Sequence, residues 1–146
     1  MEILLLATLW EKTADLLDVL GDNPYKSRAY RKGARSLKYN ALSLAELVKQ
    51  NKLKDLPGIG KSLAMEAEEF LETHKLSHFR KLQNKIPDSL LELVEIGLNA
   101  KLVGNLHQGY GISNLNALEE ALLTGKIRKV SGIGPKREQA LKTLLA

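Results

Sequence analysis

The sequence lacks several features on which familiar catalytic centres depend. None of its 146 residues is cysteine, which excludes disulfide frameworks, thiolate zinc sites and cysteine nucleophiles. It contains no Walker loop, no nucleophile elbow and no aspartate triad of the two-metal type. The apolar run from Ile3 to Leu9 is too short to cross a bilayer and has no basic leader, so we expect a buried helix there. These absences favour an intracellular, cytoplasmic protein.

The chain does have a substantial apolar content and an excess of positive charge. Hydrophobic residues make up 44% of it, enough for one domain or two small ones with a real core. Its 22 basic residues outnumber its 17 acidic residues, giving a formal charge of +5. This modest excess favours a polyanionic partner without identifying one.

Apolar residues recur at steps of three and four along most of the chain, which is typical of amphipathic helices. We expect an all-α fold, a bundle of short helices without strands. Asn23 and Pro24 suit the start of one helix, and Ser43 with Glu46 forms a capping box before another. The packing side predicted for the helix after Asn23 consists of Tyr25, Ala29, Tyr30, Ala34 and Leu37.

One short phrase occurs twice, as Leu56-Pro57-Gly58-Ile59-Gly60-Lys61 and Val130-Ser131-Gly132-Ile133-Gly134-Pro135-Lys136. Its glycines permit positive φ or a close backbone approach, and its isoleucine can turn inward to join two helices. A lysine then stands beside the first amides of a new helix, an arrangement suited to phosphate. The phrase predicts contact with a nucleic-acid backbone rather than with bases.

A third, imperfect copy is centred on Gly97-Leu98-Asn99, where we expect Asn99 to replace the second glycine because asparagine tolerates left-handed geometry. The copies lie 39 and 35 residues apart, counted from Gly58 to Gly97 to Gly132, which favours a helical repeat, with a solenoid of helix pairs as the alternative. The break at Lys85-Ile86-Pro87-Asp88 predicts two domains, 1–85 and 86–146.

Charge is unevenly distributed along the chain. The segment from Lys26 to Lys38 carries six basic residues and no acidic one, which favours a binding face over an ordinary solvated helix surface. Acidic residues gather instead between Glu66 and Glu72, on a face that should avoid DNA. His74 and His78 have a spacing that suits metal ligands, but no further ligand accompanies them, so we expect no metal there.

The run from Tyr25 to Lys32, together with Leu56-Pro57-Gly58-Ile59-Gly60, resembles the amino-terminal region of family X DNA polymerases, the DNA polymerase beta group, over nearly the whole chain. The resemblance implies a small lyase-like domain with the first helix-hairpin-helix in residues 1–85. It implies a second helical module, with a degenerate and a regular hairpin, in residues 86–146. The catalytic palm does not follow, so we expect no polymerase activity.

In that family the small domain binds a 5′-phosphate, and the matching positions are Lys26, Tyr30 and Lys54, with Lys61 close by. The Schiff-base lysine of the family falls at Glu66, and a carboxylate cannot form an imine. The resemblance implies no cofactor other than a monovalent cation, K⁺ or Na⁺, held by the carbonyls of a hairpin. Its ligands would lie near Lys54, Leu56 and Ile59, and again near Arg128, Val130 and Ile133.

We therefore predict a non-catalytic, non-sequence-specific DNA-binding protein of DNA repair that recognises gaps or 5′-phosphates. The predicted DNA contacts are Lys26, Arg28, Tyr30, Arg31, Arg35, Lys54, Gly58, Ile59, Gly60, Lys61, Gly132, Ile133, Gly134, Lys136 and Arg137. One alternative is an abasic-site lyase that uses Lys61 or Lys26 as a substitute amine. Another is a protein-interaction module on the same scaffold, and RNA is an alternative ligand. Expected partners are gapped, nicked or duplex DNA and a polymerase or other repair protein, with no membrane, at the nucleoid or in the nucleus.

Overall fold

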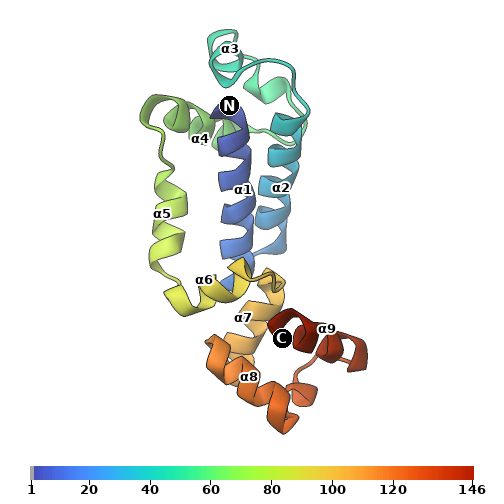
Figure 1. Ribbon diagram of the computed structural model, residues 1–146. Coiled ribbons are helices and arrows are strands. Elements are labelled where there is room, and N and C mark those ends of the chain that lie inside the picture. The colour runs from blue at the N-terminus through green and yellow to red at the C-terminus, as the bar shows by residue number, and fades with distance from the viewer. Residues whose placement is uncertain (1) are drawn as a thin grey trace. The chain divides into compact units, whose positions relative to one another are not determined.

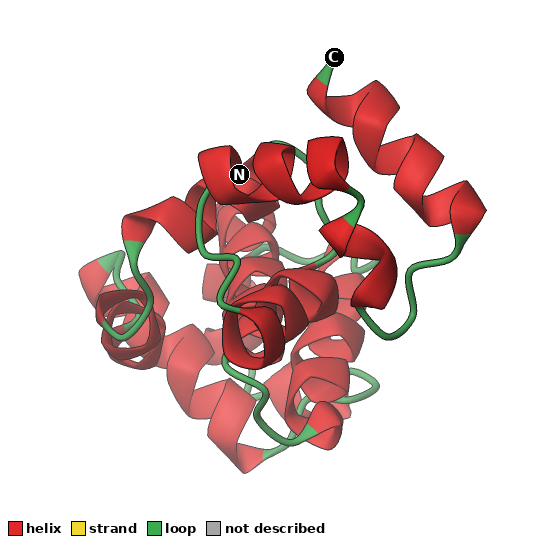
Figure 2. Ribbon diagram, turned by 90° about the horizontal axis from the view of Figure 1, so that it is seen from below, coloured by secondary structure: helices red, strands yellow, loops and turns green. Residues whose placement is uncertain are grey.

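A computed structural model describes residues 2–146 and contains helices and no strand within that range (Figures 1 and 2). The all-α prediction is confirmed. The chain divides into two compact units, one made of residues up to Asp18 with Asp22–Lys85 and the other of Val19–Gly21 with Ile86–Ala146. The functional assignment of the domains 1–85 and 86–146 stays a prediction, and residue 1 lies outside the described part.

The first unit is a small bundle whose two longest helices lie side by side and run in opposite directions (Figure 1). Two ion pairs join these helices, one between Glu11 and Lys38 and the other between Asp18 and Arg31. Shorter helices complete the unit. Its elements are α1 (Glu2–Val19), α2 (Pro24–Lys38), α3 (Leu44–Lys49), the 3₁₀ helix η1 (Leu53–Asp55), α4 (Lys61–Thr73) and α5 (Ser77–Asn84).

Trp10 is fully buried at the centre of the first unit and meets the ring of Tyr30 edge-on, with ring centroids 6.5 Å apart. Helix α2 approaches Trp10 closely because position 33 is glycine. A Cβ at Gly33 would lie 3.0 Å from Leu63 Cδ1 and 3.1 Å from Trp10 Cζ3. The core of this unit is therefore an aromatic pair packed against a helix that a glycine brings near.

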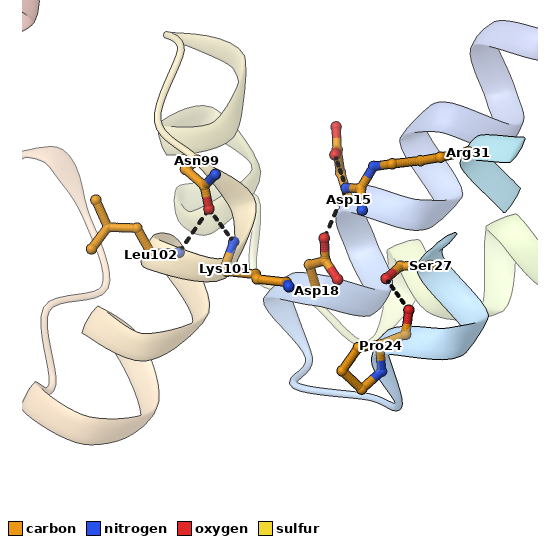
Figure 3. Close-up of polar contacts among 8 residues, drawn as sticks. All are labelled: Asp15, Asp18, Pro24, Ser27, Arg31, Asn99, Lys101 and Leu102. Carbon is orange, nitrogen blue, oxygen red and sulfur yellow. Dashed lines mark hydrogen bonds and ion pairs between the residues drawn. The ribbon is translucent and has the colours of Figure 1, made fainter. Parts of the chain in front are cut away.

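The predicted packing side of α2 is partly wrong. Tyr25 and Ala29 are exposed, and Ser27 and Gly33 are buried in their place. The hydroxyl of Ser27 donates to the carbonyl oxygen of Pro24 at 3.1 Å, so this buried polar group has a partner (Figure 3). At position 33, α2 lies so close to Trp10 that a larger residue than glycine does not fit, whereas Tyr30, Ala34 and Leu37 are buried as predicted.

Helix α5 was not predicted, because its sequence resembles a polar linker. The preceding helix α4 ends at Thr73 and is capped by His74, which adopts a left-handed conformation with φ of 59°. Leu76 and Leu82 are then buried and anchor α5 to the unit. Leu76, Phe79 and Leu82 nevertheless recur at steps of three, a helical period that the mostly polar composition of the segment obscures.

The second unit packs its helices around buried aliphatic side chains that include Leu93, Leu106 and Leu118. The side chain of Asn114 caps α8 by accepting from the amide of Ala117 at 2.7 Å, and Gly125 ends α8 with φ of 79°. The elements are α6 (Asp88–Glu95), α7 (Ala100–Tyr110), α8 (Leu115–Thr124), the 3₁₀ helix η2 (Lys126–Lys129) and α9 (Pro135–Leu145).

Candidate nucleic-acid interface

The two intact hairpin phrases form the same tight turn. The amide of Ile59 donates to the carbonyl of Leu56 at 3.1 Å, and the amide of Ile133 donates to that of Val130 at 3.2 Å. The third residue of each turn is a glycine with positive φ, which is 84° at Gly58 and 86° at Gly132. The second residue of each turn does not have positive φ, so both turns are of type II.

Each turn sends its isoleucine inward, as the sequence predicts. Ile59 and Ile133 are both buried, and each joins the 3₁₀ helix before the turn to the helix after it. The loop backbone on the other side of the isoleucine is exposed at Gly58 and at Gly132. The hairpin thus combines an apolar anchor with a backbone surface that is open to a ligand.

The second glycine of each intact hairpin is not required by backbone strain. Gly60 and Gly134 have φ of −94° and −95°, values that any residue adopts, and a Cβ at either would meet nothing within 4 Å. Both are N-caps without a side-chain acceptor, so the first amides of α4 and α9 have no cap partner. What glycine provides here is unobstructed access to amides at the positive end of a helix.

The imperfect copy differs. Asn99 takes the N-cap place of the second glycine, as predicted, but the left-handed geometry predicted for it is wrong. Asn99 has φ of −62°, and its side chain caps α7 by accepting from the amides of Lys101 at 3.0 Å and Leu102 at 3.3 Å (Figure 3). Gly97 ends α6 with φ of 114°, and the amide of Leu98 donates to the carbonyl of Leu93, as in a Schellman motif. Because its own side chain occupies these amides, this copy offers no equivalent anion site.

The basic helix α2 carries less free charge than its sequence indicates. Arg31 pairs with Asp15 at 2.9 Å and with Asp18 at 2.8 Å, both on α1 (Figure 3). Lys26 pairs with Asp22 at 3.5 Å, and Lys38 pairs with Glu11. The absence of acidic residues within α2 is therefore compensated by acidic residues of α1 and by Asp22 in the loop between the two helices. The inference that this helix is a uniformly available cationic face is corrected accordingly.

Lys32 is a candidate that the predicted site omitted. Its aliphatic stem lies over the first hairpin, so that a Cβ at Gly58 would approach Lys32 Cγ to 2.7 Å. The hydroxyl of Ser36, one helical turn later, donates to the carbonyl of Pro57. Lys32 has no carboxylate partner among residues 2–146. No local spacing in the sequence links α2 to the hairpin, so only the tertiary structure shows this neighbour.

The other predicted contacts fall into two groups. Exposed cations with no ion pair in the described part of the chain are Arg28, Arg35, Lys54, Lys61 and Lys136. Arg137 instead donates to the carbonyl of Gly132 at 3.3 Å, which places its guanidinium against the intact hairpin from Val130 to Lys136, the third hairpin in chain order. Nearby, Arg128 is held by Glu138 at 2.9 Å, and its guanidinium lowers the pKa of that carboxyl. Lys54, Lys61 and Lys136 lie in or next to the two intact hairpins in the sequence, whereas the Arg28 guanidinium lies over the Tyr25 ring, 5.3 Å from its centroid.

Tyr30 is 8% exposed, and its hydroxyl donates to Glu66 at 2.5 Å, so it belongs to the core more than to an open face. Burial raises the pKa of Glu66, although the Tyr30 hydroxyl and His78 oppose this effect. One carboxyl oxygen of Glu66 is fully buried without a hydrogen-bond partner. A cavity of about 430 Å³ adjoins this pair and is lined by Ser62, Met65, Glu66, Glu69, Ser77, His78 and Lys81.

Glu66→Gln is expected to stabilise the protein at neutral pH. Because the folded state raises the pKa of Glu66 above its ordinary value of 4.5, folding favours the protonated carboxyl and disfavours the charged one. The charged carboxylate of Glu66 therefore destabilises the folded wild-type protein increasingly as pH rises from about 4.5 through the raised pKa. Urea unfolding at pH 7 and pH 4 should show a more stable glutamine variant at pH 7 only. An equal difference in unfolding free energy between variant and wild type at both pH values would contradict this expectation.

Two further expectations concern ions and membranes. Residues 2–146 contain no cluster of three or more histidine and carboxylate side chains that could hold a metal ion. His74 lies 3.8 Å from the carboxylate of Glu2, and His78 stacks on Tyr30. The monovalent cation expected at the hairpin carbonyls stays a prediction. In the described range, no helix has the length and apolar content needed to span a membrane.

Comparison with known proteins agrees with the hairpin geometry. Residues 3–76 match the family described as "Helix-hairpin-helix domain". The chain is also similar to the DNA polymerase/3′-5′ exonuclease PolX of Bacillus subtilis (strain 168), with 31% identity over 134 residues. That match covers 91% of this chain and 23% of the relative, so the chain spans about a quarter of the length of the curated protein that it matches.

Proposed function

This chain belongs to the helix-hairpin-helix domain family, and from that membership we propose that it binds DNA through the sugar-phosphate backbone without reading base sequence. The observation that carries the proposal is the pair of intact hairpins. In each, the first backbone amides of the next helix have no cap partner, and an exposed lysine stands at the start of that helix. In the first unit this lysine is Lys61, and in the second it is Lys136. Amides and cations of this kind hold phosphates and position a protein on DNA.

The contacts proposed for the first unit are the hairpin from Gly58 to Lys61 together with Lys32, Arg35 and Lys54. These cations are exposed and lack carboxylate partners. In the second unit, the proposed contacts run from Gly132 to Arg137. Lys26 and Arg31 are placed outside this set because acidic residues already neutralise them.

We further propose a role in DNA repair with a preference for gapped DNA. The similarity to a DNA polymerase/3′-5′ exonuclease supports a polymerase-related context, and the polymerase and exonuclease activities of that relative are not proposed for this chain. The carboxyl group of Glu66 lies beside Tyr30, where it would repel a phosphate. Capture of a 5′-phosphate therefore depends on the cations around the first hairpin, and lyase chemistry at Glu66 is not part of the proposal.

Fluorescence anisotropy with labelled DNA tests this function. Four ligands of equal length are compared at low salt: 5′-phosphorylated gapped duplex, the same gap without the phosphate, intact duplex and single strand. We expect the strongest binding to the phosphorylated gap and measurable binding to every duplex, because backbone contacts are common to them all. Equal affinity for gapped and intact duplex would limit the function to a general DNA clamp. Absence of binding by the folded chain would refute the proposal and favour a protein partner.

A further inference from the structure

A tyrosine hydroxyl fastens the third hairpin from the side. The amide of Ser131 donates to the Tyr110 oxygen at 3.0 Å, and the Tyr110 hydroxyl donates to the carbonyl of Lys129 at 3.2 Å. Asn105, on the same helix α7, donates through its side-chain amide to the carbonyl of Ser131 at 3.4 Å. Two side chains of α7 therefore hold the backbone on both sides of Val130, where the turn begins.

The first hairpin is fastened by different chemistry. Its residue equivalent to Ser131 is Pro57, whose ring restricts φ and which has no amide hydrogen to satisfy. Proline also suits the second position of a type II turn. Ser131 has neither property, because its φ is less restricted and its amide needs a partner. The hydroxyl of Tyr110 supplies that partner, so the two hairpins reach the same turn by different means.

We propose that Tyr110 is a positioning residue for DNA binding by the third hairpin. By bridging Lys129 and Ser131, it holds the turn in the form that presents the amides from Gly132 to the start of α9. Helix α7, which begins at the imperfect hairpin copy, thus serves the third hairpin without contacting DNA itself. This inference rests on the proposed backbone-binding function.

Tyr110→Phe isolates the hydroxyl from the ring. The ring lines a cavity of about 300 Å³ together with Ile112 and Val130, and phenylalanine keeps that packing. Loss of one positioned hydrogen-bonding group should weaken DNA binding by roughly three- to tenfold. The salt dependence should stay close to that of the wild type, because tyrosine and phenylalanine are both uncharged and no cation is removed.

A second substitution makes the test specific. Ser131→Pro in the Tyr110→Phe background removes the amide that needs a partner and restricts φ, as in the first hairpin. The double variant should recover most of the lost affinity. Tyr39→Phe serves as the matched control, because Tyr39 is 88% exposed and its hydroxyl has no hydrogen bond among residues 2–146. Affinity is measured by anisotropy on gapped duplex over a salt series, and urea unfolding verifies that each variant is folded.

Three results would overturn the inference, each in a different way. Wild-type affinity in Tyr110→Phe would show that the hydroxyl does not position the turn. An equal loss in the Tyr39→Phe control would show that the effect does not come from the hydroxyl that bridges the turn. A weakened variant that Ser131→Pro fails to rescue would show that the lost function does not lie in the turn. Absence of DNA binding by the wild type, in contrast, would refute the proposed function as well.

Discussion

The affinity of this chain for gapped duplex is expected to fall about a thousandfold when salt rises from about 50 to about 200 mM, if the two hairpins together neutralise roughly six phosphates. Each neutralised phosphate releases condensed counterions, so the logarithm of affinity falls in proportion to the number of contacts. The free cations beside the first hairpin, Lys32, Arg35, Lys54 and Lys61, and those beside the third make this number attainable.

Lys61→Ala with Lys136→Ala is the variant that tests this origin of the salt dependence. Both lysines are exposed, stand at the start of a hairpin's second helix and have no ion pair in the described range. Their joint loss should weaken binding by roughly tenfold per lysine at low salt. It should also reduce the slope of log affinity against log salt concentration by about two in magnitude. Binding is measured by anisotropy, with the salt series repeated for each variant.

Lys38→Ala with Lys142→Ala is the matched control. It removes the same charge from the same two units, but Lys38 is paired with Glu11, and Lys142 is paired with Glu138 at 3.3 Å. We expect a small change in affinity from the altered net charge alone. Equal losses in the two double variants would mean that binding follows overall charge, and the hairpins would lose their assigned role.

Trp10→Ala is expected to lower the free energy of unfolding of the first unit by about 3–5 kcal/mol. The indole is fully buried, packs against Tyr30 and fills the space beside Gly33, so alanine would leave a cavity. For a unit of this size, the melting temperature should fall by at least about 10 °C. Urea and thermal unfolding, followed by circular dichroism, measure both quantities.

Leu123→Ala provides the control for a large apolar residue outside the core. Leu123 is 88% exposed on α8, so its truncation should change stability by less than about 0.5 kcal/mol. Trp10→Phe should give an intermediate loss, since it keeps part of the aromatic packing. A Trp10→Ala variant as stable as the wild type would mean that the core of the first unit does not depend on this residue.

Much of the candidate site could be predicted because it is local. The type II turns follow from glycine at a position of positive φ, and the Ser43 and Asn114 caps follow from side chains that reach amides within three residues. The inward isoleucines follow from the same short phrase. Interactions within three or four residues depend on the backbone geometry alone, so the amino-acid order is sufficient to specify them.

The sequence by itself thus determined the helical class, the two intact hairpins and their open helix starts. Only the tertiary structure decided which cations are free, because Arg31 meets Asp15 and Asp18 across two helices. It also placed Lys32 over Gly58 and Tyr110 beside Ser131, positions 26 and 21 residues apart. Charge pairing and side-chain bridging depend on distances in space, and these arise from how the apolar faces of the helices pack.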